Sequence, residues 1–310
     1  MTILELLEWG NRKLKDHRDI DAFTGDKLDS PMLDAEILLS HVLDESKSYL
    51  FTHLNEDVPE KQAALYQRMI KRRVKHEPVA TIIGKKEFFK REFTVNRFVL
   101  TPRPETEVLI ENAIDHANKL AGKDAGDTWF ADIGTGSGAI AITLAAETKT
   151  PVVATDISAE ALAVARQNAE EHKVTDLVDF KTGDTLVPIV KLFKQLKKIK
   201  QPLPDNLILC ANLPYLTTEQ WEKAQPEVRD WEPKQALEAG SDGLDVYWIL
   251  FKQLAQHRTL LPKNLFVLIE IDPSQTAAAN KLIRHHFPEA ELETKKDLAG
   301  LDRVLITQLS

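Results

Sequence analysis

The sequence predicts an α/β protein, in which a Rossmann-like parallel sheet with flanking helices follows a small N-terminal helical domain. Two observations support this fold class. From about Thr101 onward, short apolar runs alternate with helical patterns, and a glycine-rich turn follows the first run, which is typical of a parallel sheet. In the first 75 residues, apolar side chains recur at helical spacing without a glycine-rich turn.

Residues 1–75 are predicted to be helical. An amphipathic stretch begins at Ile3, and Lys61–Val74 has the pattern of a later helix. Between them, Ser30 and Pro31 predict a helix start, because serine caps a helix and proline fits its first position. We therefore expect a small all-helical domain.

Residues 76–98 are expected to form a β-hairpin linker. Val79–Ile83 and Glu87–Val95 are rich in β-branched and aromatic residues, and Gly84 supplies a turn between them. Residues 99–310 are then expected to form the α/β domain. Its candidate strands are Trp129–Ile133, Val152–Thr155, Leu177–Phe180, Leu207–Ala211, Leu265–Ile271 and Val304–Gln308.

The composition limits the class of protein. No run approaches the ~18 apolar residues that span a bilayer, and the acidic N-terminus does not fit a signal peptide. The single cysteine, Cys210, cannot form an intramolecular disulfide or a cysteine zinc site, and its strand context predicts a small core residue. We expect a cytoplasmic protein without a membrane partner.

Charge and histidine content exclude two further kinds of site. The net charge of −8 argues against a protein that coats nucleic acid through phosphate contacts. The basic stretch Lys191–Lys200 is a candidate phosphate-binding patch, but the solvated face of a surface helix explains it more simply. The nine histidines show no paired ligand spacing, so no metal site is expected.

A glycine-rich turn follows the first strand candidate and precedes the helical stretch Ala139–Ala146. Alternate glycines let the backbone approach a ligand closely, and the helix behind them offers free N–H groups. On its own the pattern also fits a simple tight turn. The turn consists of Gly134, Thr135, Gly136, Ser137 and Gly138.

Asp156 ends the second strand candidate, about 20 residues after the glycines, where an acid can accept hydrogen bonds from ribose hydroxyls. Together the two features predict an adenosine cofactor. The G-x-G-x-G spacing differs from the dinucleotide pattern G-x-G-x-x-G and favours S-adenosylmethionine over a nicotinamide cofactor. The alternative for Asp156 is a cap for the helix that begins after Ser158.

The third feature is the run Asn212, Leu213, Pro214 and Tyr215, which follows an apolar strand candidate. An amide or exocyclic amine nitrogen is a poor nucleophile, because its lone pair is delocalised. The Asn212 side-chain oxygen and a neighbouring backbone carbonyl can accept hydrogen bonds from its NH2 group and orient that lone pair towards a methyl donor. Pro214 stiffens the loop, and Tyr215 offers an aromatic face for a planar group. A plain turn after a strand is the alternative.

Several segments in sequence order resemble the bacterial peptide chain release factor glutamine methyltransferases (the HemK/PrmC family), and the resemblance covers nearly the whole chain. These segments are Leu33–Leu39, Glu77–Gly84, Thr101–Glu107, Asp132–Ile142, Asp156–Arg166, Glu227–Pro233, Lys296–Gly300 and Asp302–Val304.

The resemblance implies a seven-stranded class I methyltransferase domain and an N-terminal domain that helps to dock the substrate. The reaction would move a methyl group from S-adenosylmethionine to the side-chain amide nitrogen of the glutamine in the Gly-Gly-Gln motif of class I release factors. We also expect a monomer with no stable nucleic-acid partner.

The same resemblance implies roles for individual residues. Asn212, Pro214 and Tyr215 would be catalytic, and with Leu213 they would line the glutamine pocket. The residues that would hold S-adenosylmethionine are Pro102, Glu105, Gly134, Thr135, Gly136, Ser137, Gly138, Asp156, Asp184, Thr185 and Asn212.

This chain departs from the family pattern at two of these positions. Leu213 replaces a proline, so the loop keeps its backbone carbonyl but loses stiffness. Asn-Leu-Pro-Tyr is also the form found in ribosomal RNA adenine dimethyltransferases. Thr185 replaces an aromatic residue that often covers the adenine.

Three other functions fit parts of the pattern. An N6-adenine or other nucleic-acid amino-group methyltransferase would use the same nitrogen chemistry, but the Thr101–Glu107 segment and the acidic balance disfavour it. A binding module without activity is disfavoured by the intact Asn212, and a dehydrogenase by the glycine spacing. Arg103 is expected to be a loop anchor or salt-bridge partner, and Glu270 could be structural or could touch the site.

Overall fold

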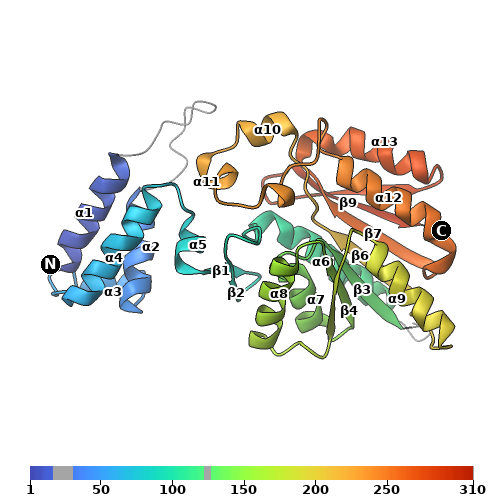
Figure 1. Cartoon of the computed structure of the whole chain (residues 1–310), viewed down its shortest axis with the longest axis horizontal. Helices are drawn as coiled ribbons and strands as arrows, with labels where there is room; N and C mark the ends of the chain where they lie inside the picture. The colour runs from blue at the N-terminus through green and yellow to red at the C-terminus, as the bar shows by residue number, and fades with distance from the viewer. Residues whose placement is uncertain (17–30, 122–126, 310) are drawn as a thin grey trace. The chain divides into compact units, whose positions relative to one another are not determined.

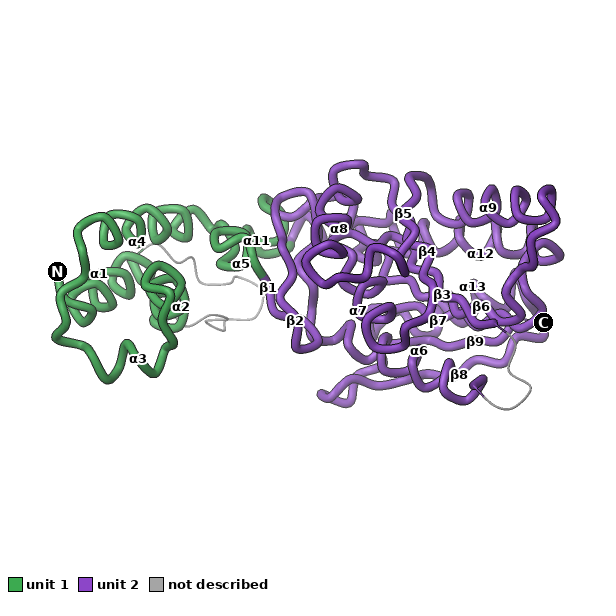
Figure 2. The backbone as a smooth tube through the Cα atoms, turned by 90° about the horizontal axis from the view of Figure 1, so that it is seen from below, with its two compact units in different colours: residues 1–85, 224–231 green, residues 86–223, 232–310 purple. Residues whose placement is uncertain are grey.

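The computed structural model describes residues 1–16, 31–121 and 127–309, and the chain forms two compact units (Figure 2). Unit 1 comprises Met1–Lys85 and Ala224–Trp231, and unit 2 comprises Lys86–Lys223 and Glu232–Ser310. The chain therefore enters unit 1 twice. The helix start predicted at Ser30 lies outside the described residues.

Unit 1 is built from helices around one apolar core. Its first helix begins with a capping box, in which the Thr2 hydroxyl accepts from the Glu5 N–H while the Glu5 carboxylate accepts from the Thr2 N–H. Leu6, Leu38 and Tyr66 are fully buried where three of the helices meet. The helices are α1 (Ile3–Lys15), α2 (Pro31–Leu43), α3 (Lys47–Thr52), α4 (Glu60–Arg73), α5 (Val79–Ile83) and α11 (Pro226–Arg229).

A buried arginine joins the two chain segments of unit 1. The Arg73 guanidinium lies 2.8 Å from the Asp34 carboxylate and 2.6 Å from the Glu227 carboxylate, with only 4% of its side chain exposed. Burial alone would lower the pKa of Arg73, but the two carboxylates outweigh it and raise that pKa. Trp231 Nε1 also donates to the Lys75 carbonyl at 3.0 Å. The short second segment is thus held to the helices by polar contacts.

The hairpin prediction is wrong for Val79–Ile83, which forms helix α5. Pro78 precedes the helix, and Gly84 ends it at φ 83°, a left-handed conformation that glycine adopts without strain. Capping residues on both sides therefore outweigh the β-branched composition of this short run. The hairpin itself consists of β1 (Lys85–Phe88) and β2 (Arg91–Thr94).

Unit 2 contains a seven-stranded sheet with the order β5-β4-β3-β6-β7-β9-β8 (Figure 1). Strands β3 to β7 are parallel to one another, and β9 runs antiparallel to both β7 and β8. The strands are β3 (Thr128–Ile133), β4 (Val152–Asp156), β5 (Val178–Thr182), β6 (Asn206–Ala211), β7 (Asn264–Glu270), β8 (Glu291–Lys296) and β9 (Asp302–Leu309).

Helices cover both faces of this sheet, because successive side chains of a buried strand point to opposite sides. Along β6, Leu209 belongs to the core under α9, α12 and α13, whereas Cys210 belongs to the core under α6, α7 and α8. Cys210 is a buried free thiol, as predicted. The remaining helices are α6 (Glu107–Leu120), α7 (Ala139–Thr148), α8 (Ala159–Glu171), α9 (Val187–Lys198), α10 (Thr218–Glu222), α12 (Asp245–His257), α13 (Thr276–His286), η1 (Pro104–Thr106), η2 (Lys234–Ala236), η3 (Arg258–Leu260) and η4 (Pro273–Gln275).

The α/β fold class is confirmed, and all six candidate strands occur in the sheet. Lys191, Lys194, Lys197 and Lys198 lie on the exposed face of α9, while Phe193 and Leu196 on its other face are buried, so the basic stretch forms a surface helix as expected. Within the part of the chain that the structure describes, no helix is long and apolar enough to cross a membrane.

Candidate functional site

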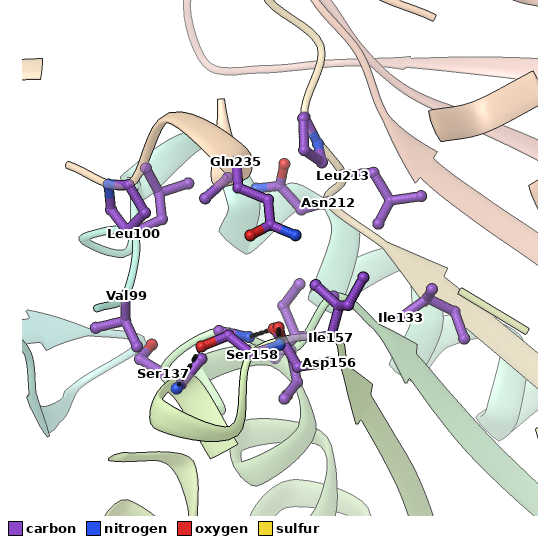
Figure 3. Close-up of a pocket in the computed structure, with 18 of the residues that line it drawn as sticks. Val99, Leu100, Ile133, Ser137, Asp156, Ile157, Ser158, Asn212, Leu213 and Gln235 are labelled. Atoms are coloured by element: carbon purple, nitrogen blue, oxygen red, sulfur yellow. Dashed lines mark hydrogen bonds between the residues drawn. The ribbon is translucent and has the colours of Figure 1, made fainter. Parts of the chain in front are cut away.

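A cavity of about 540 Å³ lies at the carboxyl ends of the parallel strands of unit 2. The chain crosses from β3 to β4 on one side and reaches β6 on the other side of β3, so the strand order reverses beside β3. Ligands of open α/β sheets bind at such a reversal. Figure 3 shows Asn212, Leu213 and Gln235 on one side of the cavity, with Asp156, Ile157 and Ser158 across from them.

The glycine-rich loop folds back onto β4 through its backbone. The Gly134 and Thr135 N–H groups both donate to the Thr155 carbonyl, at 2.8 and 2.9 Å. Gly136 faces open space, since no atom lies within 4 Å of the position that a Cβ would occupy. All of the loop residues except Gly138 line the cavity. The Gly138 backbone instead packs against α8, where an added Cβ would lie 3.1 Å from that of Ala165.

Asp132 anchors this loop from below. Its Oδ2 accepts from the Thr135 hydroxyl at 2.6 Å and from the Ala141 N–H at 3.1 Å. Burial raises the pKa of Asp132 to about 7, and the two hydrogen bonds only partly offset that effect. Asp132 does not line the cavity. It therefore holds the loop in shape.

Asp156 lines the cavity at the end of β4 and binds backbone on both sides. Its two carboxylate oxygens accept from the Gly136 N–H and the Ser158 N–H, each at 2.9 Å. Ser158, rather than Asp156, is the N-cap of α8, because its hydroxyl accepts from the Ala161 N–H. Burial raises the pKa of Asp156 above its ordinary value, and these backbone bonds only partly offset that rise. The Ile157 N–H bonds the carboxylate as well, which leaves acceptor capacity on at least one oxygen for a ligand hydroxyl.

Asp184 and Thr185 line the cavity from the loop after β5. The Thr185 hydroxyl donates to Gln253 Oε1 of α12 at 2.7 Å, and the Thr185 carbonyl accepts from the Thr155 hydroxyl at 3.2 Å. The side chain that replaces the usual aromatic residue is therefore engaged with the protein. Ile157, just after the neighbouring strand β4, also lines the cavity, is 54% exposed and offers an apolar face.

Asn212, Leu213 and Pro214 line the cavity directly after β6. Asn212 Nδ2 donates to the Thr106 hydroxyl at 3.0 Å. Leu213 is buried, and its Cδ2 lies 2.8 Å from where a Cβ on Gly134 would sit. The loop after β6 thus packs directly on the glycine-rich loop after β3.

Tyr215 does not line the cavity. Its ring packs against the core under α12, and its carbonyl accepts from Gln275 Nε2 at 2.7 Å. Burial raises the pKa of Tyr215 above its ordinary value. Tyr215 is therefore placed to support the turn, and the structure does not bring its ring to the cavity with Asn212.

The segment before α6 contributes one wall. Pro102 lines the cavity, and Arg103 is held by the buried Glu232 carboxylate at 2.6 Å, as expected of a loop anchor. Burial raises the pKa of Glu232 and the Arg103 charge opposes this rise. Glu105, in η1, is exposed and does not line the cavity.

Comparisons with known proteins agree with this geometry. Residues 5–84 match the family described as the PrmC N-terminal domain, and residues 126–223 match a methyltransferase domain. A release factor glutamine methyltransferase of Bacillus cereus is 34% identical over the whole length of both chains. That of Bacillus subtilis is 36% identical over 98% of this chain and 96% of its own. The chain belongs to the release factor glutamine methyltransferase family.

A solved structure supports the fold of this family member. The catalytic domain of hMettl16, in complex with a MAT2A 3'UTR hairpin, covers 98% of this chain and 91% of its own with a TM-score of 0.53. The two sequences are 13% identical, so the likeness concerns the fold. It confirms a Rossmann-like methyltransferase sheet.

Among the residues that line the cavity of this family member, sequence reasoning missed Thr106 and Gln235, and it left Glu270 outside the cavity undecided. Thr106 lies in the segment that resembles the family signature, but its hydroxyl carried no visible signal until Asn212 was placed beside it. Gln235 lines the cavity from η2, far along the chain. Glu270 was left open, although an acid at the carboxyl end of a buried strand is a useful signal. Burial raises its pKa to about 7.

Proposed function

We propose that this chain transfers a methyl group from S-adenosylmethionine to the side-chain amide nitrogen of the glutamine in the Gly-Gly-Gln motif of class I peptide chain release factors. One observation carries the proposal. Asn212, with its amide nitrogen held by Thr106, lines the same cavity as the glycine-rich loop and Asp156. A group that can recognise an amide is therefore adjacent to a site that suits an adenosine cofactor.

The cavity residues fit S-adenosylmethionine. The open space beside Gly136 lets a ligand approach the backbone, and a Cβ there would occupy it. Asp156 keeps acceptor capacity for ribose hydroxyls, and Ile157 presents an apolar surface for the base. A cavity of about 540 Å³ is also of the size usual for small-molecule sites. We expect Asp184, Thr185 and Pro102 to complete the cofactor site.

The chemistry follows from the acceptor that Asn212 can orient. When bound, S-adenosylmethionine supplies a methyl group on a sulfonium, which is a good leaving group. The Asn212 side-chain oxygen and a backbone carbonyl of the Leu213–Pro214 turn would accept the two N–H bonds of the glutamine amide. These contacts aim the nitrogen lone pair along the line of transfer and favour the positive charge that develops on nitrogen.

Bond and proton changes then balance without a strong general base. A nitrogen–carbon bond forms as the sulfur–carbon bond breaks, and the excess proton leaves the alkylated nitrogen for water. Asn212 and Pro214 would contact the glutamine, and Leu213 would hold the turn against Gly134. Tyr215 would support that turn through its buried ring.

We further propose that unit 1 helps to dock the release factor to a monomeric enzyme. The match of residues 5–84 to the PrmC N-terminal domain supports this role. Unit 1 also exposes large apolar side chains, among them Phe51, which is 52% exposed. Such side chains can contribute to a protein interface.

A nucleic-acid amino-group methyltransferase is the second candidate, because the same nitrogen chemistry would serve adenine. Its structural support is the exposed lysine face of α9. The relatives that match this chain along its whole length are named for release factor glutamine instead. We therefore keep it as an outcome of the experiment.

The test is methyl transfer from labelled S-adenosylmethionine to a purified class I release factor. The same factor with its Gly-Gly-Gln glutamine replaced by alanine is the control, and ribosomal RNA is a third substrate. We expect label on the intact factor alone. Label on the RNA, or on the alanine-substituted factor to the same extent, would refute the proposed substrate.

A further inference from the structure

Asn212 can accept hydrogen bonds from a glutamine amide only if its side-chain oxygen faces the cavity. A primary amide presents an acceptor on one side and two donors on the other, and a flip of the group exchanges them. If its nitrogen faced the cavity instead, the Asn212 NH2 group would face the NH2 group of the substrate glutamine, and no hydrogen bond could form. The residues that hydrogen-bond the Asn212 side chain on the side away from the cavity therefore decide whether its oxygen can accept from the substrate.

Two residues behind Asn212 form a hydrogen-bonded chain with it. Asn212 Nδ2 donates to the Thr106 hydroxyl at 3.0 Å, and the side chains of both residues hydrogen-bond the Glu270 carboxyl. Thr106 ends η1 on one wall of the site, whereas Glu270 ends β7, the strand next to β6. Three separate segments therefore meet at this point.

The available donors and acceptors fix the direction of each hydrogen bond between Glu270, Thr106 and Asn212. When Glu270 is ionised, above its pKa of about 7, its carboxylate can only accept, and the Thr106 hydroxyl has a single proton to give. Thr106 must therefore donate to Glu270, which leaves its oxygen as the acceptor for Asn212. Only the NH2 side of the Asn212 amide can satisfy that acceptor. The Asn212 oxygen is then turned away from Thr106.

Burial sets Glu270 apart from the groups that touch ligands. It is 1% exposed and does not line the cavity, and its Oε2 has no hydrogen-bond partner among the described residues. The charges that face it are Arg303 of β9, which favours its ionised form, and Glu105 of η1, which opposes it. Tyr215 and Tyr247 also interact with it electrostatically, and the Tyr247 hydroxyl donates to the Glu270 backbone carbonyl. Burial of an ionised acid costs free energy of folding, so a buried acid next to a site is a candidate functional group.

We propose that Glu270 is a positioning residue that, through the Thr106 hydroxyl, locks the Asn212 amide with its oxygen towards the methyl acceptor. Glu270 itself touches neither cofactor nor substrate. The inference deepens the proposed function, on which it rests for the identity of the acceptor.

Matched variants separate this role from simple packing. Thr106→Val keeps the shape but removes the hydroxyl, Thr106→Ser keeps the hydroxyl, and Glu270→Gln keeps the size but can donate as well as accept. Thr307→Val is the control, because Thr307 is a buried threonine of β9 whose hydroxyl has no partner in the described chain. Steady-state methylation of a release factor is measured for all four.

The expected kinetic result is a split between turnover and binding. A misplaced amide costs on the order of 100-fold in rate, so we expect Thr106→Val and Glu270→Gln to lose about 10- to 100-fold in kcat. KM for the release factor and for S-adenosylmethionine should change little. Thr106→Ser and Thr307→Val should stay within about threefold of the parent chain. A loss of kcat in Thr106→Ser equal to that in Thr106→Val would overturn the proposed role of the Thr106 hydroxyl.

A second readout does not depend on activity. The side-chain NH2 signal of Asn212, assigned by its disappearance in Asn212→Asp, is followed for hydrogen exchange in a 15N-labelled sample. For the N–H that bonds Thr106, exchange should be slow in the parent chain and in Thr106→Ser. It should be at least about tenfold faster in Thr106→Val, since that bond is lost while the one to Glu270 remains. Unchanged exchange in Thr106→Val would refute the proposal even if no release factor is methylated, whereas a failed methylation assay with the expected exchange pattern would refute only the proposed substrate.

Discussion

The backbone N–H of Leu213 donates to the Tyr247 hydroxyl at 3.2 Å. That hydroxyl is also hydrogen-bonded to the carbonyls of Ala211 and Glu270. A proline at position 213, as in the family pattern, has no N–H and could not make this bond. Leucine at this position therefore gives up ring stiffness, and an anchor to α12 replaces it.

The anchor predicts a measurable coupling between Leu213 and Tyr247. Tyr247→Phe should lower the free energy of unfolding by about 1–3 kcal/mol, because it leaves the buried Leu213 N–H without a partner. In a Leu213→Pro background that loss should be smaller by on the order of 1 kcal/mol. Urea unfolding of the four proteins of this cycle measures the difference. Strictly additive effects would show that the bond has no energetic weight.

Removal of the Asn212 amide should separate turnover from cofactor binding. We expect Asn212→Ala to lose at least about 100-fold in kcat, since a preorganised group that acts on developing charge is gone. S-adenosylmethionine binding, measured by calorimetry, should be at least partly retained. Unchanged turnover would contradict the assigned role of Asn212.

Asp156 should act on cofactor affinity. In Asp156→Asn one oxygen is replaced by a donor, so the bonds to ribose weaken along with one of those to Gly136 and Ser158. We expect the Kd for S-adenosylmethionine to rise about 10- to 100-fold, with a smaller effect on kcat at saturation. Asp176→Asn, at an exposed position of unit 2, is the control and should leave Kd unchanged. An unaltered Kd in Asp156→Asn would leave Asp156 with a structural role only.

The buried Asp132 should make stability depend on pH. Its pKa of about 7 in the folded chain lies above its ordinary value of 3.8, so the folded state holds more protons between these values. Stability is therefore fully present below the lower pKa and falls as pH rises towards the higher one, by up to ~1.4 kcal/mol per pH unit. Asp132→Asn should show a shallower fall between about pH 5 and about pH 7 than the parent chain. Glu270, whose pKa is also about 7, keeps part of the slope in both.

Urea unfolding across this pH range measures that difference. Asp176→Asn, at an exposed position of unit 2, is the substitution control. A steeper fall in Asp132→Asn than in the parent chain would contradict the assigned pKa direction.

Arg73 should stabilise unit 1 far more than a surface ion pair does. Arg73→Met leaves the Asp34 and Glu227 carboxylates without their shared cation, and such a loss costs about 3–5 kcal/mol. Lys223→Met, which removes an exposed partner of Glu219, should change the stability much less, because solvent screens that pair. Thermal unfolding of both variants checks the contrast. Equal losses of stability would mean that the buried pair has no special weight.

The sheet of unit 2 was largely predictable, because its central strands are continuous apolar runs between turn residues. β8 was not among the candidate strands. Its sequence Glu-Leu-Glu-Thr-Lys-Lys is polar, and no residue in it is fully buried. β8 is an edge strand, and edges are commonly charged, so it lacks the apolar signal on which strand prediction depends.

The candidate site was predictable where residues follow strands directly and was less so elsewhere. Asp156 and Asn212 both end a strand, and the cavity brings them together. Glu105 was assigned by resemblance alone, and Tyr215 was assigned both for its aromatic face and by resemblance; neither lines the cavity. Thr106 acts through a hydrogen bond to a residue over 100 positions away, and such a pairing becomes visible only when the chain is folded.

The double entry of the chain into unit 1 has an evolutionary consequence. Recombination near Lys85 would replace the helices of a recipient chain, including its Asp34 and Arg73. The recipient would keep its own Glu227. The resulting hybrid would carry an acid without its buried cation. The helical unit and the eight-residue insert 224–231 must therefore be inherited as a matched pair, and homologues that exchange one should be found to have exchanged the other.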